Sequence, residues 1–179
     1  MPDGARLIVA GLGNLLLRDD GIGVHAARAL AADPPADALI LDIGTAVLHA
    51  LSFLEPGSRV LAIDAVQAGG TAGALYLLDG RAAAPPGARA SAHAWGLGAA
   101  MRLLPGGEKK VEILILGVEP ERIEYGTDLS PTLAAGLPRL VAKARDLAQR
   151  WQTGPRAASE MLRLYAAPAA TTTERRMAP

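Results

Sequence analysis

The sequence has 179 residues, 50% of them hydrophobic, so the chain is long and apolar enough for one domain with a substantial core. Lys plus Arg and Asp plus Glu each number 18, and only 3% of the residues are aromatic. Balanced charge and scarce aromatic rings argue against a nucleic-acid-binding protein. The absence of cysteine excludes disulfides, thiolate metal sites and cysteine nucleophiles.

The first residues, MPDGARLIVAGLGN, lack the basic start and the long apolar run of a signal peptide. No apolar stretch approaches the roughly 20 residues that a membrane-spanning helix needs. We therefore expect a cytoplasmic protein that does not enter a membrane, with a monomer as the default assembly.

Short apolar runs bounded by turn residues predict five buried β-strands. They lie at residues 6–11, 38–42, 58–66, 74–79 and 111–118. The connection between the third and fourth runs contains the turn GGTAG. A parallel crossover needs about a dozen residues or more, so this short connection favours an antiparallel pair of strands.

The segments between these runs predict helices, at residues 22–32, 43–54, 91–104 and 132–151. The last of them has an apolar face at helical spacing, formed by Leu133, Leu137, Leu140, Val141, Ala144 and Leu147. Alternating strands and helices predict an α/β fold. We expect a single domain with a twisted, mostly parallel five-stranded sheet, one antiparallel strand and helices on both faces.

The predicted domain covers residues 1–154, which contain all of these elements. The chain changes character in residues 155–179, which we interpret as a C-terminal extension. Its first part, PRAASEMLRLYAA, allows a short helix, whereas APAATTTERRMAP lacks periodicity and is expected to be disordered.

Three predicted loops carry residues suited to chemistry. They are GLGNLLLRDDGIG after the first strand, the turn IDA with Asp64, and SAH before the third helix. In open α/β sheets, binding sites gather at the carboxyl ends of the strands, which would bring Asp20, Asp64 and His93 to one edge. Two carboxylates and an imidazole suit a divalent transition metal such as nickel or zinc, and they are also able to activate water as general bases.

Each of these residues also has a structural explanation. Asp19 or Asp20 is well placed to cap the following helix, and Asp64 is equally well explained as a turn acid. A single loop histidine such as His93 is more often not a metal ligand. His25 and His49 lie in Ala- and Leu-rich helical patterns, and we interpret both as structural.

The glycines of GLGNLL resemble the start of a dinucleotide-binding fingerprint, and Asp42 ends the second strand where such proteins hold a ribose. However, Leu16 occupies the third glycine position, and two acidic residues precede the helix where a pyrophosphate would bind. Dinucleotide binding is therefore the weaker alternative. No HExxH or GxSxG motif and no pair of pepsin-like motifs is present.

The stretch GLGNLLLRDDGIGVHAARAL closely resembles the opening of the hydrogenase maturation endopeptidases. Four further segments resemble motifs of that family in the same order, from about residue 5 to residue 150. They are LDIGTA, in which Ile43 replaces a glycine of the family pattern, AIDAV, SAHAWGL and GVEPERIEYGTDLSP. One such segment would be weak evidence, whereas five in order are specific.

This resemblance implies an enzyme that removes a C-terminal extension from the large subunit of a nickel–iron hydrogenase after nickel insertion. The family's three metal-contacting positions fall on Asp20, Asp64 and His93. The nickel would belong to the substrate precursor, with no resident cofactor expected. Candidate supporting residues are Asn14, Asp19, Asp42 and Thr45. A non-catalytic chaperone that grips the metal-loaded subunit remains a second alternative.

Overall fold

The computed structural model describes residues 6–80, 89–90, 96–99, 111–154 and 157–166. All five predicted strands are present, with bounds within two residues of those expected. They are β1 (Leu7–Leu12), β2 (Ala38–Gly44), β3 (Arg59–Gln67), β4 (Leu75–Asp79) and β6 (Glu112–Val118). A two-residue strand that the sequence did not predict, β5 (Arg89–Ala90), adds a short antiparallel pairing to the end of β3.

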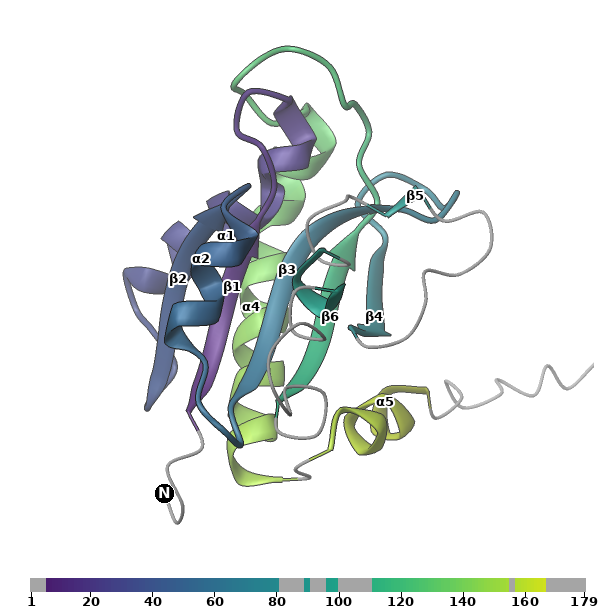
Figure 1. The fold of residues 1–179 in the computed structure, drawn as a ribbon. Coiled ribbons are helices and arrows are strands. Elements are labelled where there is room, and N and C mark those ends of the chain that lie inside the picture. Colours follow the sequence, from purple (N-terminus) through teal and green to yellow (C-terminus); the bar gives the residue numbers. More distant parts are fainter. Residues whose placement is uncertain (1–5, 81–88, 91–95, 100–110, 155–156, 167–179) are drawn as a thin grey trace, which may run out of the picture.

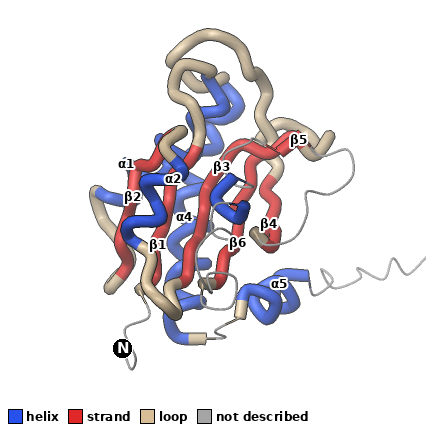
Figure 2. Tube along the Cα trace, viewed as in Figure 1, coloured by secondary structure: helices blue, strands red, loops and turns tan. Residues whose placement is uncertain are grey.

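The main sheet has the strand order β2-β1-β3-β6-β4 (Figures 1 and 2). The pairs β1–β2, β1–β3 and β3–β6 are parallel, and β4 runs antiparallel to β6. The carboxyl ends of the parallel strands therefore meet at one edge of the sheet, the upper edge in Figure 1. The predicted α/β class, with one antiparallel strand in a mostly parallel sheet, is confirmed.

The predicted partner of the antiparallel strand is wrong. The short connection suggested that β4 pairs with β3, but β6 lies between them, and Leu75 of β4 pairs with Val118 of β6. The segment after β3 crosses the end of β6 and turns back on its far side. Residues 68–70 donate backbone hydrogen bonds to Glu119, directly after β6, and this interaction holds the crossing segment in place.

One face of the sheet is covered by α1 (Ile22–Ala31) and α4 (Pro131–Thr153), close to the predicted helices. The Ser130 hydroxyl caps α4 by accepting the Leu133 N–H at 3.4 Å. The apolar face of α4 packs into this core as its spacing predicted, with Leu133, Leu140, Ala144 and Leu147 buried. Leu137 and Val141 are partly buried beside them.

On the opposite face, the described cover consists of short helical segments. The helix predicted over 43–54 is shorter than expected and is split into α2 (Val47–Ala50) and a turn of 3-10 helix, η2 (Leu51–Phe53). Residues 96–99, inside the predicted helix 91–104, are helical, and their Leu97 is buried against this face. The remainder of that predicted helix lies outside the described residues.

The last described helix, α5 (Ala158–Ala166), lies within the predicted C-terminal extension and packs against β4 and β6. Its Ala158 and Met161 are buried in the same core as α1 and α4. The guanidinium group of Arg59, at the start of β3, donates to the Trp151 carbonyl and ties α4 to the sheet. Among the described residues, no helix is both long enough and apolar enough to cross a membrane.

Candidate active site

Asp64 lies inside β3, within the predicted strand 58–66, and the chain does not turn at the IDA segment. Pairing with β1 ends at Ile63, whereas pairing with β6 continues through Ala65. At Asp64, β1 therefore no longer pairs with β3, although β6 still does. Alternation along β3 places Asp64 on the face of Ala62 and Val66, the face that α2 and Leu97 cover.

The chain that leaves β1 forms a compact loop and returns to the sheet through a turn of 3-10 helix, η1 (Arg18–Gly21). Two glycines make this return possible. Gly13 has a φ of +119°, and a Cβ there would overlap the Asp20 carbonyl. A Cβ on Gly23 would overlap the Ile63 and Leu12 carbonyls. The start of α1 therefore approaches β3 directly beside Asp64, and η1 contacts β3.

Asp20 lies in η1 and is buried, with 5% of its surface exposed. Its Oδ2 accepts the Asn14 N–H at 2.9 Å, and the Asn14 Oδ1 accepts the Leu16 N–H at 3.0 Å. Asn14 thus links Asp20 to the loop before η1, and its support of the reaction stays a prediction. Asp64 is fully buried, and its Oδ1 accepts the Ala65 N–H at 2.9 Å. Two buried carboxylates therefore lie at the carboxyl edge of the sheet, on contacting elements.

Asp19 has a different role from the helix cap expected from the sequence. Neither η1 nor α1 has a side-chain cap, and the residues at the cap positions are Leu17 and Gly21. The fully buried carboxylate of Asp19 instead accepts three backbone N–H groups from the segment after β6. Its Oδ2 accepts those of Glu121 at 2.9 Å and Arg122 at 2.8 Å, and its Oδ1 accepts that of Ser130 at 2.7 Å.

Glu119 is a buried acid that the sequence reasoning did not single out. Its carboxylate accepts the backbone N–H groups of residues 68–70 and the Tyr76 hydroxyl, the latter at 2.7 Å. Burial by itself would raise the pKa of Glu119, but the hydroxyl and amide donors outweigh it and hold that pKa below its ordinary value. Burial and the adjacent carboxylate raise the pKa of Tyr76. The sequence signal that could have identified Glu119 is its position directly after the apolar run 111–118. The structure places it against Gly69 and Gly70.

The other predicted supporting residues lie at the end of β2. Gly13 donates to the Gly44 carbonyl at 3.1 Å, so this strand end belongs to the same edge of the sheet. Asp42 accepts from Arg28 of α1 at 2.8 Å in an exposed ion pair, and Thr45 is exposed. Such exposed pairs contribute little to stability, about 0–1 kcal/mol. The described contacts of Asp42 thus run to α1, and its support of the site stays a prediction.

His93 lies outside the described residues, so the geometry of the third predicted site residue is not described. The other two histidines have contacts of their own. Burial and the Arg28 charge lower the pKa of His25 in α1, although the Asp42 charge opposes them. The exposed His49 packs edge-on against Phe53, with ring centroids 5.3 Å apart. Within the part of the chain that the structure describes, no three acids or histidines form a metal-binding group.

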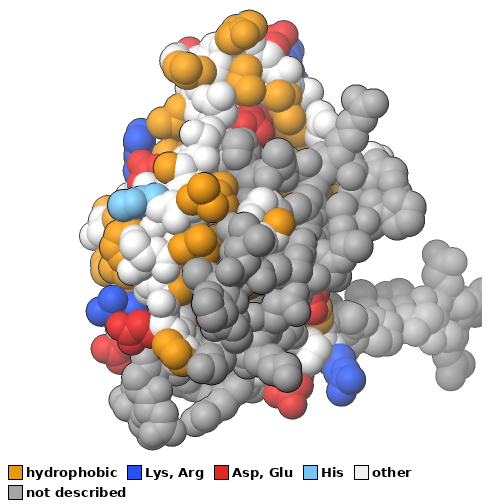
Figure 3. Space-filling view, in the orientation of Figure 1, with side chains coloured by type: hydrophobic (Ala, Val, Ile, Leu, Met, Phe, Trp, Pro, Cys, Tyr) orange, Lys and Arg blue, Asp and Glu red, His pale blue; other side chains and the backbone are white. Residues whose placement is uncertain are grey.

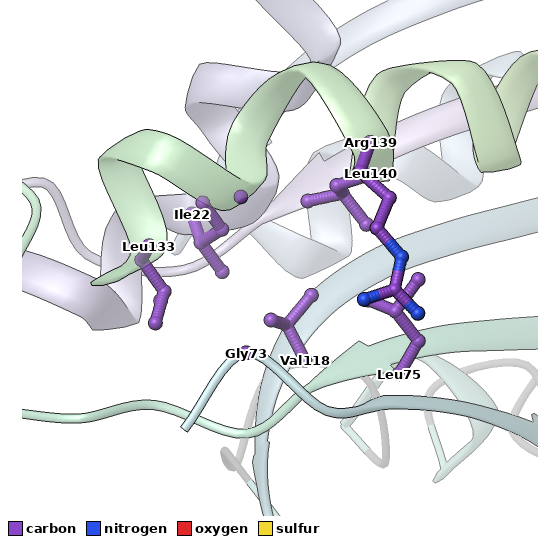
Figure 4. Close-up of a pocket in the computed structure, with 8 residues that line it drawn as sticks. Ile22, Gly73, Leu75, Val118, Leu133, Arg139 and Leu140 are labelled. Atoms are coloured by element: carbon purple, nitrogen blue, oxygen red, sulfur yellow. The ribbon is translucent and has the colours of Figure 1, made fainter. Parts of the chain in front are cut away.

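A small cavity lies between α1, α4 and the strands β4 and β6 (Figure 4). Its volume is about 30 Å³, room for no more than a few waters. It is lined mainly by apolar side chains, among them Ile22, Leu75, Val118 and Leu140, and the Arg139 side chain extends across it toward Leu75. A peptide does not fit in this space.

Comparison with known proteins is decisive for the family. A family model described as hydrogenase maturation protease matches residues 24–146 of the chain. The chain belongs to the hydrogenase maturation proteases. The matched range contains Asp64 and His93 and begins just after Asp20.

Individual relatives extend this match over more of the protease. Hydrogenase 2 maturation protease of Escherichia coli is 33% identical over 137 residues, which cover 73% of this chain and 82% of the relative. The coenzyme F420 hydrogenase subunit delta of Methanothermobacter thermautotrophicus is 27% identical, over 82% of this chain and 96% of the relative. The structure is similar to the [NiFe] hydrogenase maturation protease HybD from Thermococcus kodakarensis. In that comparison the TM-score is 0.66 and the identity 29%, covering 80% of this chain and 99% of the other.

The same α/β architecture also occurs in the hydrogenase maturating endopeptidase HybD of Escherichia coli. The TM-score is 0.66 at 26% identity, over 83% of this chain and 94% of that one. The protease is therefore a hydrolase of the peptidase class. Its buried acids stand on a scaffold that solved endopeptidases share.

Proposed function

We propose that this protease removes the C-terminal extension of a nickel–iron hydrogenase large-subunit precursor after nickel has been inserted. The observation that carries the proposal is the placement of Asp20 and Asp64. Both are buried, and they lie on contacting elements at the carboxyl edge of the sheet of a hydrogenase maturation protease. This edge is where open α/β sheets place their binding sites.

The nickel in this proposal belongs to the substrate. Asp20, Asp64 and His93 would contact it while it is held by the precursor, because carboxylate oxygen and imidazole nitrogen are suitable ligands for a divalent transition metal. Leu97, four positions after His93, packs on the face of the sheet that carries Asp64, which supports His93 as the third group. Contact with the nickel would fix the scissile peptide bond relative to the protease. Binding of the metal would thereby also hold that bond close to the catalytic groups.

The proposed reaction is hydrolysis of one peptide bond. Water loses a proton to a carboxylate of Asp20 or Asp64, and its oxygen bonds to the carbonyl carbon. The carbon–nitrogen bond then breaks, and the proton passes to the leaving amine. The substrate's nickel is able to assist by polarising the same carbonyl. With an aspartate as the general base, the protease would be an aspartyl protease, although its sequence lacks the paired motifs of a pepsin-like enzyme.

The test compares two forms of one precursor, with and without nickel, mixed with the protease in the cytoplasmic pH range. Intact mass measures the loss of the extension. We expect cleavage of the nickel-loaded form only. Equal cleavage of both forms would reject nickel recognition, and a stable complex with unchanged mass would favour the non-catalytic chaperone.

His93→Ala tests the third residue in the same assay. We expect cleavage to be abolished or severely reduced while the circular dichroism spectrum and melting temperature stay those of the wild type. Full activity of this variant would remove His93 from the site. We further propose that the protease works as a cytoplasmic monomer, which light scattering of the pure protein and fractionation of cells would test.

A further inference from the structure

Exposed apolar side chains gather on two loops beside the candidate active site. Among the described residues, Leu16 is 62% exposed, Ile123 40% and Tyr125 90%. Leu16 belongs to the loop before η1, and the other two belong to the segment after β6. Figure 3 shows hydrophobic side chains over this end of the molecule, where both loops project beyond the sheet in Figure 1. We call Leu16, Ile123 and Tyr125 the apolar tip.

Backbone hydrogen bonds join the two loops of the apolar tip. Gly126 donates to the Leu16 carbonyl at 3.0 Å, and Arg18 donates to the Gly126 carbonyl at 2.9 Å. Leu17 and Gly126 form a parallel bridge between the loops. Tyr125 therefore lies next to Leu16, although the two residues are far apart in the sequence.

The apolar tip is also fixed relative to Asp20. Asp19, its neighbour in η1, accepts three N–H groups of the segment that carries Ile123 and Tyr125. Arg18 takes a left-handed φ of 51°, a conformation that persists in a non-glycine residue only where the surroundings hold it. The backbone that presents the tip is therefore already ordered before binding, which lowers the entropy cost of docking, and aromatic side chains are favoured anchors in protein interfaces.

We propose that the apolar tip docks the folded protein substrate beside the scissile peptide, against an apolar surface of the precursor. This proposal rests on the proposed function and names a surface of the same site. A substrate whose peptide reaches Asp20 must lie beside the loops that hold Asp20 in place. Such a substrate would contact the protease at two places: at the apolar tip and, through its own metal, at the acids.

Two other occupants fit the tip less well. The surrounding charged residues are of both signs, Arg18 and Arg122 with Glu121 and Glu124, so the tip lacks the basic cluster that attracts an anionic membrane surface. A second copy of this chain would need roughly 800 Å² on each partner for a stable interface, far more than three side chains provide.

The test uses the nickel-loaded precursor with the variants Tyr125→Ser and Leu16→Ser. Leu48→Ser is the matched control, because Leu48 is 69% exposed on α2 and outside the apolar tip. Interferometry measures the Kd for the precursor, and intact mass over time gives KM and kcat. For each tip variant we expect Kd and KM to rise about tenfold, with kcat within about twofold of the wild type. We expect Leu48→Ser to match the wild type and Tyr125→Phe to restore most of the affinity.

The outcomes separate the two proposals. A wild-type protease that cleaves the precursor, with tip variants of unchanged Kd and KM, would overturn the docking surface alone, and an equal loss in Leu48→Ser would do the same. A wild type that binds through the tip without cleaving would overturn the peptidase proposal and keep the surface. A wild type that neither binds nor cleaves overturns both. Tip-dependent self-association or tip-dependent binding to anionic phospholipid vesicles, with unchanged affinity for the precursor, would assign the tip to those partners instead.

Discussion

Two pairs of buried acids at the same edge of the sheet differ in what they bind. Asp19 and Glu119 accept backbone N–H groups from segments about 50 to 110 positions away in the chain. The hydrogen bonds described for Asp20 and Asp64 come from Asn14 and Ala65, within six positions. Burial therefore does not distinguish an anchoring acid from a candidate catalytic one. What marks Asp19 and Glu119 as anchoring acids is the set of backbone N–H groups that they accept from distant segments.

The largest expected effect comes from removing the charge of the candidate catalytic acids. Asp20→Asn and Asp64→Asn keep the size of the side chain but remove the general base, so we expect kcat to fall by about 10²–10⁴-fold. The measurement is intact mass of the nickel-loaded precursor over time. The melting temperature should change by only a few degrees. Normal cleavage by either variant would contradict a catalytic role for the residue that it replaces.

Asp19→Ala should produce the reverse pattern. The change leaves the N–H groups of Glu121, Arg122 and Ser130 without their charged acceptor, so we expect unfolding free energy to fall by about 3 kcal/mol or more in urea denaturation. Asp128→Ala, which removes an exposed acid from the same segment, is the control and should stay within about 0.5 kcal/mol of the wild type. A stable Asp19→Ala protein would contradict the anchoring role.

Glu119→Gln gives a smaller effect, and that effect depends on pH. The folded protein holds the pKa of Glu119 below its ordinary value, so its carboxylate stabilises the fold at pH values above that ordinary pKa, and the contribution disappears as pH falls through the lowered pKa. We expect the variant to lose about 1–3 kcal/mol at pH 7, with the difference from the wild type shrinking in acid. Urea denaturation from pH 7 to pH 3 measures it.

Tyr76→Phe sharpens this prediction, because it removes one of the four donors to Glu119 and leaves the carboxylate in place. We expect a loss of about 1–2 kcal/mol, smaller than that of Glu119→Gln. A difference between Glu119→Gln and the wild type that stayed constant with pH would show that the charge of Glu119 is not what matters.

The sequence predicted what depends on local pattern. Apolar runs located all five main strands, and the spacing of Leu133, Leu140 and Leu147 located α4 and its buried face. The run 58–66 placed Asp64 within the third strand, but nothing in that segment shows that β6 pairs past Asp64 while β1 does not. The position of β6 between β3 and β4 depends on a partner about 40 residues away and was missed for the same reason.

The candidate site divides in the same way. Asp20 and Asp64 were selected because they follow strands in motifs that resemble a known family. The separation of Asp19 from Asp20 was not predictable, because adjacent acids before a helix have the same local pattern and only the fold shows which one meets residues 121–130. Glu119 was missed because its donors come from a loop about 50 positions earlier.

The close approach of Gly23 to the Ile63 carbonyl has a consequence for how such a site is able to vary. The contact joins main chain to main chain, and it sets the spacing between the backbones that carry Asp20 and Asp64. A residue with a Cβ in place of Gly23 would force the two backbones apart. With that spacing fixed, side-chain length is a direct way to change how far each acid extends, and Asp20→Glu would advance the carboxylate by one methylene.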